Sequence, residues 1–157
     1  MVKGGIILNL ENEFEEIMQY AHWRNWLPDW EIVRKIYSEY PESYSVLLPF
    51  AYSYLEELIR STTSEYGREI IDENGNEKTR KTGVDLINMA ISQNREKIDD
   101  VSNLKELKKY FIKSKSDDEG NNRNNVVHGY MHPRFWDKET FEELICNIAK
   151  ISKYAGF

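Results

Sequence analysis

The chain has 157 residues, a length that suits one domain and excludes a large multidomain enzyme. With 40% hydrophobic residues, 31% charged residues and a single cysteine, the composition is that of an ordinary globular chain that needs neither a disulfide bond nor a structural metal ion to fold. The net charge of −6 argues against sequence-independent binding of long nucleic acids, which depends on many contacts between basic side chains and phosphates.

The N-terminal segment Met1–Leu10 is too short in its apolar stretch for a secretory signal and lacks a small-residue cleavage site. No apolar run in the sequence approaches the roughly 20 residues that cross a bilayer. We therefore expect one cytoplasmic domain over residues 1–157, with no membrane partner.

Two helices are predicted before Pro41. Apolar residues recur at helical spacing over residues 11–26, and Pro28 is expected to end this first helix. A shorter helix is expected over residues 29–39, where Asp29 can serve as the N-cap.

The longest helix is predicted to begin near Pro41, which suits a first helical turn. Its apolar residues keep the helical period over many turns: Tyr44, Leu47, Leu48, Ala51, Tyr54, Leu55, Leu58 and Ile59. We expect this helix at the centre of the fold. After it, Asn74-Gly75 lies between polar residues and indicates a tight turn, with a small hairpin near residues 70–80.

Three more helices are predicted in the second half of the chain. Helical spacing runs from Val84 to Ile98, and Ser102 can cap a following helix that ends near Phe111. Asp137 stands at the N-cap of the last helix. The hydrophobic staple and apolar stripe of that helix comprise Trp136, Phe141, Leu144, Ile145, Ile148 and Ile151. Together these patterns predict an all-α fold, an antiparallel bundle of about five or six helices.

Only one segment of the chain carries net positive charge. Residues 101–136 hold seven basic and four acidic groups, which leaves room for a few phosphate contacts. The candidates for these phosphate contacts, and so for binding a nucleic acid, are Lys105, Lys109, Lys113 and Arg134. The lysines could equally form a solvated helix face.

Histidine is the side chain best suited to acid–base catalysis near neutral pH, and the chain has three. His22 falls within the first predicted helix and is interpreted as structural. His128 lies in the segment Asn121–Arg134, which also holds Arg123 and four asparagines just before the capped last helix. On a helical turn Asn124 and His128 share a face, so that Asn124 can orient the imidazole.

The run from Arg123 to His128 (RNNVVH) matches the Arg-x(4–6)-His motif of the HEPN superfamily, and Tyr130 extends it to the Arg-x4-His-x-Tyr form seen in HEPN toxins. The motif lies in the C-terminal third of an all-α pattern, directly before a helix. The chain therefore resembles HEPN domains, most specifically over about residues 121–155.

This resemblance implies a helical bundle that forms a homodimer, so that two copies of the motif face one cleft. It implies a metal-independent endoribonuclease without a cofactor, of the toxin or phage-defence effector type, with single-stranded RNA as substrate and an antitoxin as a further partner. The implied catalytic residues are Arg123, Asn124, His128 and Tyr130, together with an acidic residue of the long helix, Glu56 or its neighbour Glu57.

The residue types suit RNA cleavage without a metal ion. The 2′-hydroxyl must lose a proton, the leaving 5′-oxygen must gain one, and the phosphorane needs a cation beside it. His128 can act as the acid or the base, an effect worth about 10²–10⁴-fold. The planar guanidinium of Arg123 matches phosphate oxygens and keeps its charge at any working pH. The motif contains no carboxylate cluster of the kind that two-metal nucleases use.

The same residues allow other interpretations. A non-catalytic module could bind a nucleotide or a protein partner through the same cleft, as the acidic net charge favours. Arg123 could instead have a structural role, paired with Asp117, Asp118 or a helix C-terminus. A metal site at His128 and His132 lacks a third ligand and is not predicted.

Overall fold

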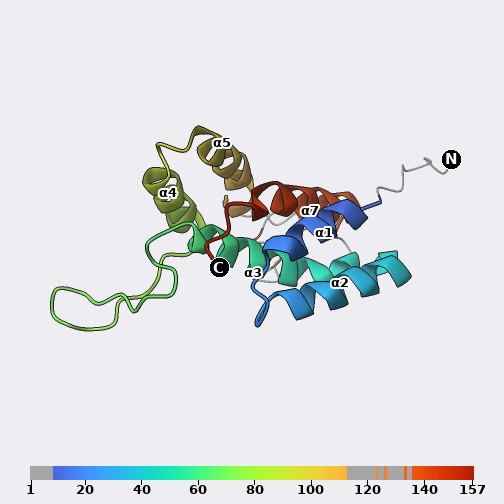
Figure 1. Cartoon of the computed structure of the whole chain (residues 1–157), viewed down its shortest axis with the longest axis horizontal. Coiled ribbons are helices and arrows are strands. Elements are labelled where there is room, and N and C mark those ends of the chain that lie inside the picture. The colour runs from blue at the N-terminus through green and yellow to red at the C-terminus, as the bar shows by residue number, and fades with distance from the viewer. Residues whose placement is uncertain (1–8, 113–122, 124–125, 127–132, 134–135) are drawn as a thin grey trace.

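The computed structural model describes residues 9–112, 123, 126, 133 and 136–157. Over these residues the chain forms six α-helices, two short 3₁₀ helices and no strand (Figure 1). They are α1 (Glu11–Tyr20), α2 (Leu27–Glu39), η1 (Pro41–Ser43), α3 (Tyr44–Ser61), α4 (Gly83–Gln93), α5 (Ile98–Leu107), η2 (Lys108–Phe111) and α7 (Lys138–Ser152). The all-α prediction is confirmed. Within the described ranges, none of these helices is long and apolar enough to cross a membrane.

Helices α1, α2, α3 and α7 form the body of the molecule, and α4 and α5 lie at one end of it (Figure 1). α1 packs against α2 and α7, α3 packs against α7 and α4, and α5 bridges α4 and α7. α3 is central, as predicted, because eleven of its 18 residues are buried. Each fully buried aliphatic or aromatic side chain contributes about 1.5–3 kcal/mol relative to exposure, so this shared core stabilises the helices. The largest fully buried side chains include Phe14, Trp30, Tyr52, Tyr54, Tyr110, Phe111 and Phe141.

The first helix ends earlier than its periodicity predicts. α1 stops at Tyr20, and the backbone carbonyl of His22 accepts the N–H groups of residues 25–27 at 2.9–3.2 Å. This turn directs Trp26 inward, where its ring packs edge-on against Tyr54 of α3 with centroids 5.2 Å apart. A tertiary contact therefore interrupts an apolar pattern that continues through the turn.

Other helix ends also differ from the sequence prediction. α2 begins at Leu27, one residue before Pro28. Pro28 therefore lies in the first turn of α2 and does not end α1, and Asp29 lies in the same turn and is not the N-cap. α4 ends just before Asn94, where both the backbone N–H and the side-chain amide of Asn94 donate to the carbonyl of Ala90, at 3.1 and 2.8 Å. Ser102 lies inside α5 and does not cap it.

The predicted hairpin is present as an arm, residues 66–80, that connects α3 to α4 and projects away from the helices (Figure 1). The Asp72 N–H donates to the Asn76 carbonyl at 2.8 Å, and Gly75 supplies the turn with a φ of +80°, which L side chains rarely adopt. The Asp72 carboxylate accepts the N–H groups of Asn76 and Asn74. These two donors hold the pKa of the Asp72 carboxyl below its usual value.

The start of α7 is capped as predicted. The Asp137 carboxylate accepts the N–H of Glu139 at 3.0 Å and the hydroxyl of Thr140 at 3.1 Å. Trp136 and Phe141, the predicted staple pair, are both buried. A cap of this type is worth about 1 kcal/mol, and it fixes the residue at which α7 begins.

The C-terminal residues fold back onto the end of α3. The Gly156 N–H donates to the Ser61 hydroxyl at 3.0 Å, and the Phe157 ring packs against Tyr54 and Tyr66 with centroids 5.9 and 5.7 Å away. A Cβ atom added at Gly156 would lie 2.1 Å from the Ser61 carbonyl oxygen. The backbones approach so closely here that only glycine fits without a shift.

We therefore expect Gly156→Ala to destabilise the fold by about 1–3 kcal/mol, the usual range for overpacking. Each kcal/mol should lower Tm by about 2–4 °C in a domain of this size. Differential scanning calorimetry checks this, with Lys150→Ala, an exposed position on α7, as the control. Equal Tm values for the two variants would contradict the contact.

Candidate functional site

A buried carboxylate on α3 binds two arginines. Glu56 accepts from Arg123 (Nη2 to Oε2, 2.5 Å) and from Arg60 (Nη2 to Oε1, 3.5 Å). The three side chains are at most 16% exposed. Charges this far from water require close partners of opposite sign, because an uncompensated buried charge strongly destabilises a fold.

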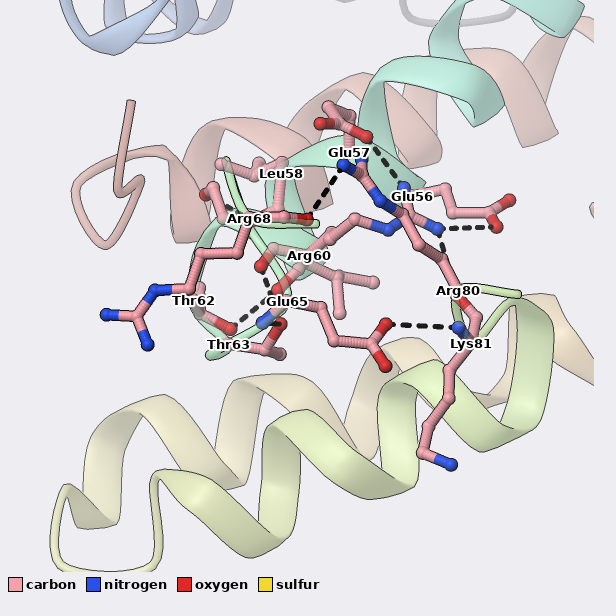
Figure 2. Close-up of polar contacts among 12 residues, drawn as sticks. Glu56, Glu57, Leu58, Arg60, Thr62, Thr63, Glu65, Arg68, Arg80 and Lys81 are labelled. Atoms are coloured by element: carbon pink, nitrogen blue, oxygen red, sulfur yellow. Dashed lines mark hydrogen bonds and ion pairs between the residues drawn. The ribbon is translucent and has the colours of Figure 1, made fainter. Parts of the chain in front are cut away.

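Helical spacing places the site on one face of α3. Glu56 and Arg60 are four residues apart and share that face, while Glu57, three residues before Arg60, accepts from its Nη1 at 2.6 Å. In Figure 2 the Arg60 guanidinium lies between the two carboxylates. We refer to Glu56, Glu57, Arg60 and Arg123 as the Glu56 cluster.

Arg60 also connects α3 to the segment that enters α4. Its Nη2 donates to the backbone carbonyl of Lys81 at 3.0 Å, and the Lys81 N–H donates to Oε2 of Glu65 at 3.0 Å (Figure 2). Arg60 and Glu65 are both buried. Because both backbone groups of Lys81 are bound, the base of the arm is fixed beside the Glu56 cluster.

Arg123 reaches Glu56 from 67 residues further along the chain. Arg123 and Val126 both have helical backbone conformation, and Val126 is buried in the hydrophobic core. A spacing of three residues puts two side chains on the same side of a helical turn. The burial of Val126 therefore helps to direct Arg123 toward α3.

A buried tyrosine one helical turn before Glu56 packs against a second buried tyrosine on η2. Tyr52 precedes Glu56 by four residues on α3, and its ring packs edge-on against Tyr110 of η2 with centroids 5.8 Å apart. The Asn147 amide donates to the Tyr110 hydroxyl at 2.7 Å. Burial raises the pKa of both phenols, so they stay protonated at neutral pH and add no charge to the Glu56 cluster.

The Glu56 cluster is electrically balanced. Glu56 and Glu57 carry two negative charges, and Arg60 and Arg123 carry two positive ones. The guanidinium of Arg123 is thus a permanent cation whose plane is held by a carboxylate, and a planar fork of donors matches the oxygens of a phosphate. The arrangement can position a cation next to a phosphate group.

The structure brings together two of the predicted catalytic residues, Arg123 and Glu56. Of the two glutamates considered for the long helix, Glu56 makes this contact. The other predicted catalytic residues lie outside the described residues: Asn124, His128 and Tyr130.

The predicted RNA-binding residues have different surroundings. Lys105 is exposed on α5, whereas Lys109 of η2 forms an ion pair with Glu143 of α7. Lys113 and Arg134 lie outside the described residues. Lys109 therefore offers less uncompensated charge than its sequence position indicates.

Arg60 was not among the residues that the sequence singled out. A signal for it exists, because Glu56 and Arg60 are opposite charges at a spacing of four in a helix. Arg60 contacts a backbone carbonyl of Lys81, so no pattern of side chains in the sequence predicts this contact.

His22, interpreted from the sequence as structural, lies in the turn between α1 and α2. Its Nδ1 accepts the N–H of Arg24 at 3.2 Å, and its ring stacks on Trp23. Among the residues that the structure describes, no group of three His, Cys, Asp or Glu side chains is placed to hold a metal ion.

Comparison with known proteins gives no match: no family model matches the chain, and no curated protein or solved structure is significantly similar to it. The candidate site therefore depends on the sequence motif and on the contacts of the Glu56 cluster.

These contacts predict different costs for two neighbouring substitutions. Glu56→Ala leaves two buried guanidinium groups without their shared acceptor and should lower the free energy of unfolding by about 3–5 kcal/mol. Glu57→Ala removes a more exposed carboxylate and should cost about 0.2–1 kcal/mol. Urea unfolding measures both, and an equal loss in the two variants would contradict the central role of Glu56.

Proposed function

We propose that this chain is a HEPN-like endoribonuclease that cleaves single-stranded RNA without a metal ion. The contact between Arg123 and Glu56 carries this proposal. It joins the arginine of the Arg-x4-His-x-Tyr motif to an acidic residue of the long central helix, two positions that the resemblance to HEPN domains implies for one active site. The all-α fold supports the same proposal.

The proposed reaction is an in-line attack of the 2′-oxygen of a ribose on the adjacent phosphorus. The bond from O2′ to phosphorus forms as the bond from phosphorus to O5′ breaks, which yields a 2′,3′-cyclic phosphate and a 5′-hydroxyl. In this scheme His128 takes the proton from the 2′-hydroxyl or supplies one to the leaving 5′-oxygen. Arg123 binds the nonbridging oxygens of the phosphorane, where negative charge develops.

Glu56 and Arg60 act as positioning residues in this scheme. A guanidinium carries five N–H donors in one plane, so it can contact a carboxylate and a phosphate at the same time. Because Glu56 holds the plane of Arg123 before substrate binds, less orientational freedom is lost on the way to the transition state. Asn124 is proposed to orient the imidazole of His128 in the same way.

A second copy of the chain completes the proposed site. Arg123 and His128 lie about 140° apart on an ideal helix, so the two do not face each other directly within one chain. A twofold dimer brings both residues of each copy to a shared cleft. Such an enzyme suits a toxin or phage-defence effector restrained by an antitoxin, and Tyr130 matches the tyrosine that antitoxins modify in related toxins.

The second candidate function is a non-catalytic module that binds a nucleotide or a protein partner at the same place. The pairing of Arg123 with Glu56 favours it, because the charge of the arginine is already compensated. The net charge of −6 favours it as well. In this case ligand binding depends on Arg123 and no RNA is cut.

The proposed activity predicts cleavage of labelled single-stranded RNA in EDTA, with a cyclic phosphate at the new 3′ end. His128→Ala should lower the rate by about 10²–10⁴-fold, because it removes the acid or base. Arg123→Lys should also lower it, since an ammonium keeps the charge but loses the planar fork.

His22→Ala, which changes a histidine in the turn between α1 and α2, is the matched control and should cleave at the wild-type rate. Wild-type cleavage by His128→Ala would contradict the proposal. Absence of cleavage by the wild type, with nucleotide binding that Arg123→Lys weakens, would favour the binding module instead.

The composite site predicts a dimer in solution. Sedimentation velocity at micromolar concentration should give about twice the 18.6 kDa mass of one chain. A monomer that nevertheless cleaves RNA would contradict the role assigned to the second copy.

A further inference from the structure

Three basic side chains at the base of the arm have no acidic partner among the described residues. Arg68, Arg80 and Lys81 are exposed, and none of them lies within ion-pair distance of a described carboxylate. Lys78 of the same arm differs, because it interacts with the carboxylate of Asp72. We refer to Arg68, Arg80 and Lys81 as the arm-base cations.

The fold holds the arm-base cations next to the Glu56 cluster. Arg80 Nη2 donates to the backbone carbonyl of Arg68 at 3.1 Å, which joins the two sides of the arm. The backbone of Lys81 is bound by Arg60 and Glu65, while its side chain extends away from these contacts (Figure 2). Replacing the Lys81 side chain therefore leaves both backbone contacts in place.

The arm-base cations matter because the Glu56 cluster itself has no net charge. Its paired arginines can contact one phosphate but give a longer strand no net attraction. Lys109 is paired with Glu143 and is compensated in the same way. Of the four acidic residues of the arm, Asp72, Glu73 and Glu77 lie around the turn at its other end, and Glu69 follows Arg68 at the base. The arm-base cations are exposed positive charges beside the Glu56 cluster, and attraction between cations and phosphates is the main source of affinity for RNA strands.

We infer that the arm-base cations bind phosphates of single-stranded RNA to one side of the phosphate that Arg123 contacts. The inference rests on the proposed function for the identity of the ligand. Contacts to phosphates carry no sequence information, so this surface sets the affinity for RNA and leaves base preference to other residues.

The test measures binding of a fluorescein-labelled, single-stranded 2′-O-methyl RNA by fluorescence anisotropy. The methyl group removes the attacking hydroxyl, so binding is observed without cleavage. Arg68→Gln/Lys81→Gln is compared with wild type and with Lys35→Gln/Lys150→Gln. The latter variant removes two exposed cations from α2 and α7 and changes the net charge equally. Kd is measured between about 50 and 200 mM salt, and Tm confirms that each variant is folded.

In the arm variant we expect weaker binding and a slope of log affinity against log salt that is smaller by about 1.4, since each phosphate contact to a single strand contributes about 0.7. Over this salt range, the affinity difference from wild type should shrink about sevenfold. The control variant should keep the wild-type slope. Equal slopes for the arm variant and the control would overturn the inference, as would a wild type that binds no RNA.

A cleavage assay on unmodified RNA separates this inference from the proposed function. If the wild type binds RNA through the arm-base cations but cuts none, the inference stands and the nuclease proposal fails. If the wild type cuts RNA and the arm variant does so with an unchanged KM, the nuclease proposal stands and the inference fails. The expected result is a raised KM in the arm variant with a kcat close to that of the wild type.

Discussion

The carboxylate of Glu56 connects three parts of the chain that are distant in sequence. It lies on the central helix α3, binds Arg123 from 67 residues later, and is linked through Arg60 to the backbone of Lys81 at the base of the arm. A buried carboxylate without a cation is costly, so the position of each partner constrains the others. Because desolvation offsets much of the attraction between buried ions, we interpret these pairs as selecting one arrangement of the segments more than as adding net stability.

The fold could be predicted from the sequence wherever local chemistry decides the structure. Neighbouring residues in the sequence determine three such features, and the structure contains all three. They are the long apolar period of α3, the Asp137 cap of α7 and the Asn74-Gly75 turn of the arm. The end of α1 could not be predicted, because apolar spacing continues through a turn that the carbonyl of His22 closes. Packing of Trp26 on Tyr54 decides that boundary, and no local pattern reports such a contact.

The candidate site divides in the same way. Arg123 and Glu56 were indicated separately, one by its motif and the other by a resemblance to a family with an acidic residue in its long helix, and the structure places them in contact. The role of Arg60 could not be predicted, because the sequence does not show which face of α3 contacts Arg123. The Lys81 contact is invisible in the sequence because a backbone carbonyl is the same at every residue. Both the role of Arg60 beside Arg123 and its contact with the Lys81 carbonyl therefore could not be predicted, because they depend on tertiary packing.

In the proposed enzyme, Glu56 acts on RNA cleavage through its contact with Arg123. A double-mutant cycle measures this most directly, using the single-turnover cleavage rates of Glu56→Gln, Arg123→Lys and the variant that carries both changes. We predict that the double variant is no slower than the slower single variant, because the two substitutions disrupt one unit. Losses in log rate that add, or a wild-type rate for Glu56→Gln, would contradict the account.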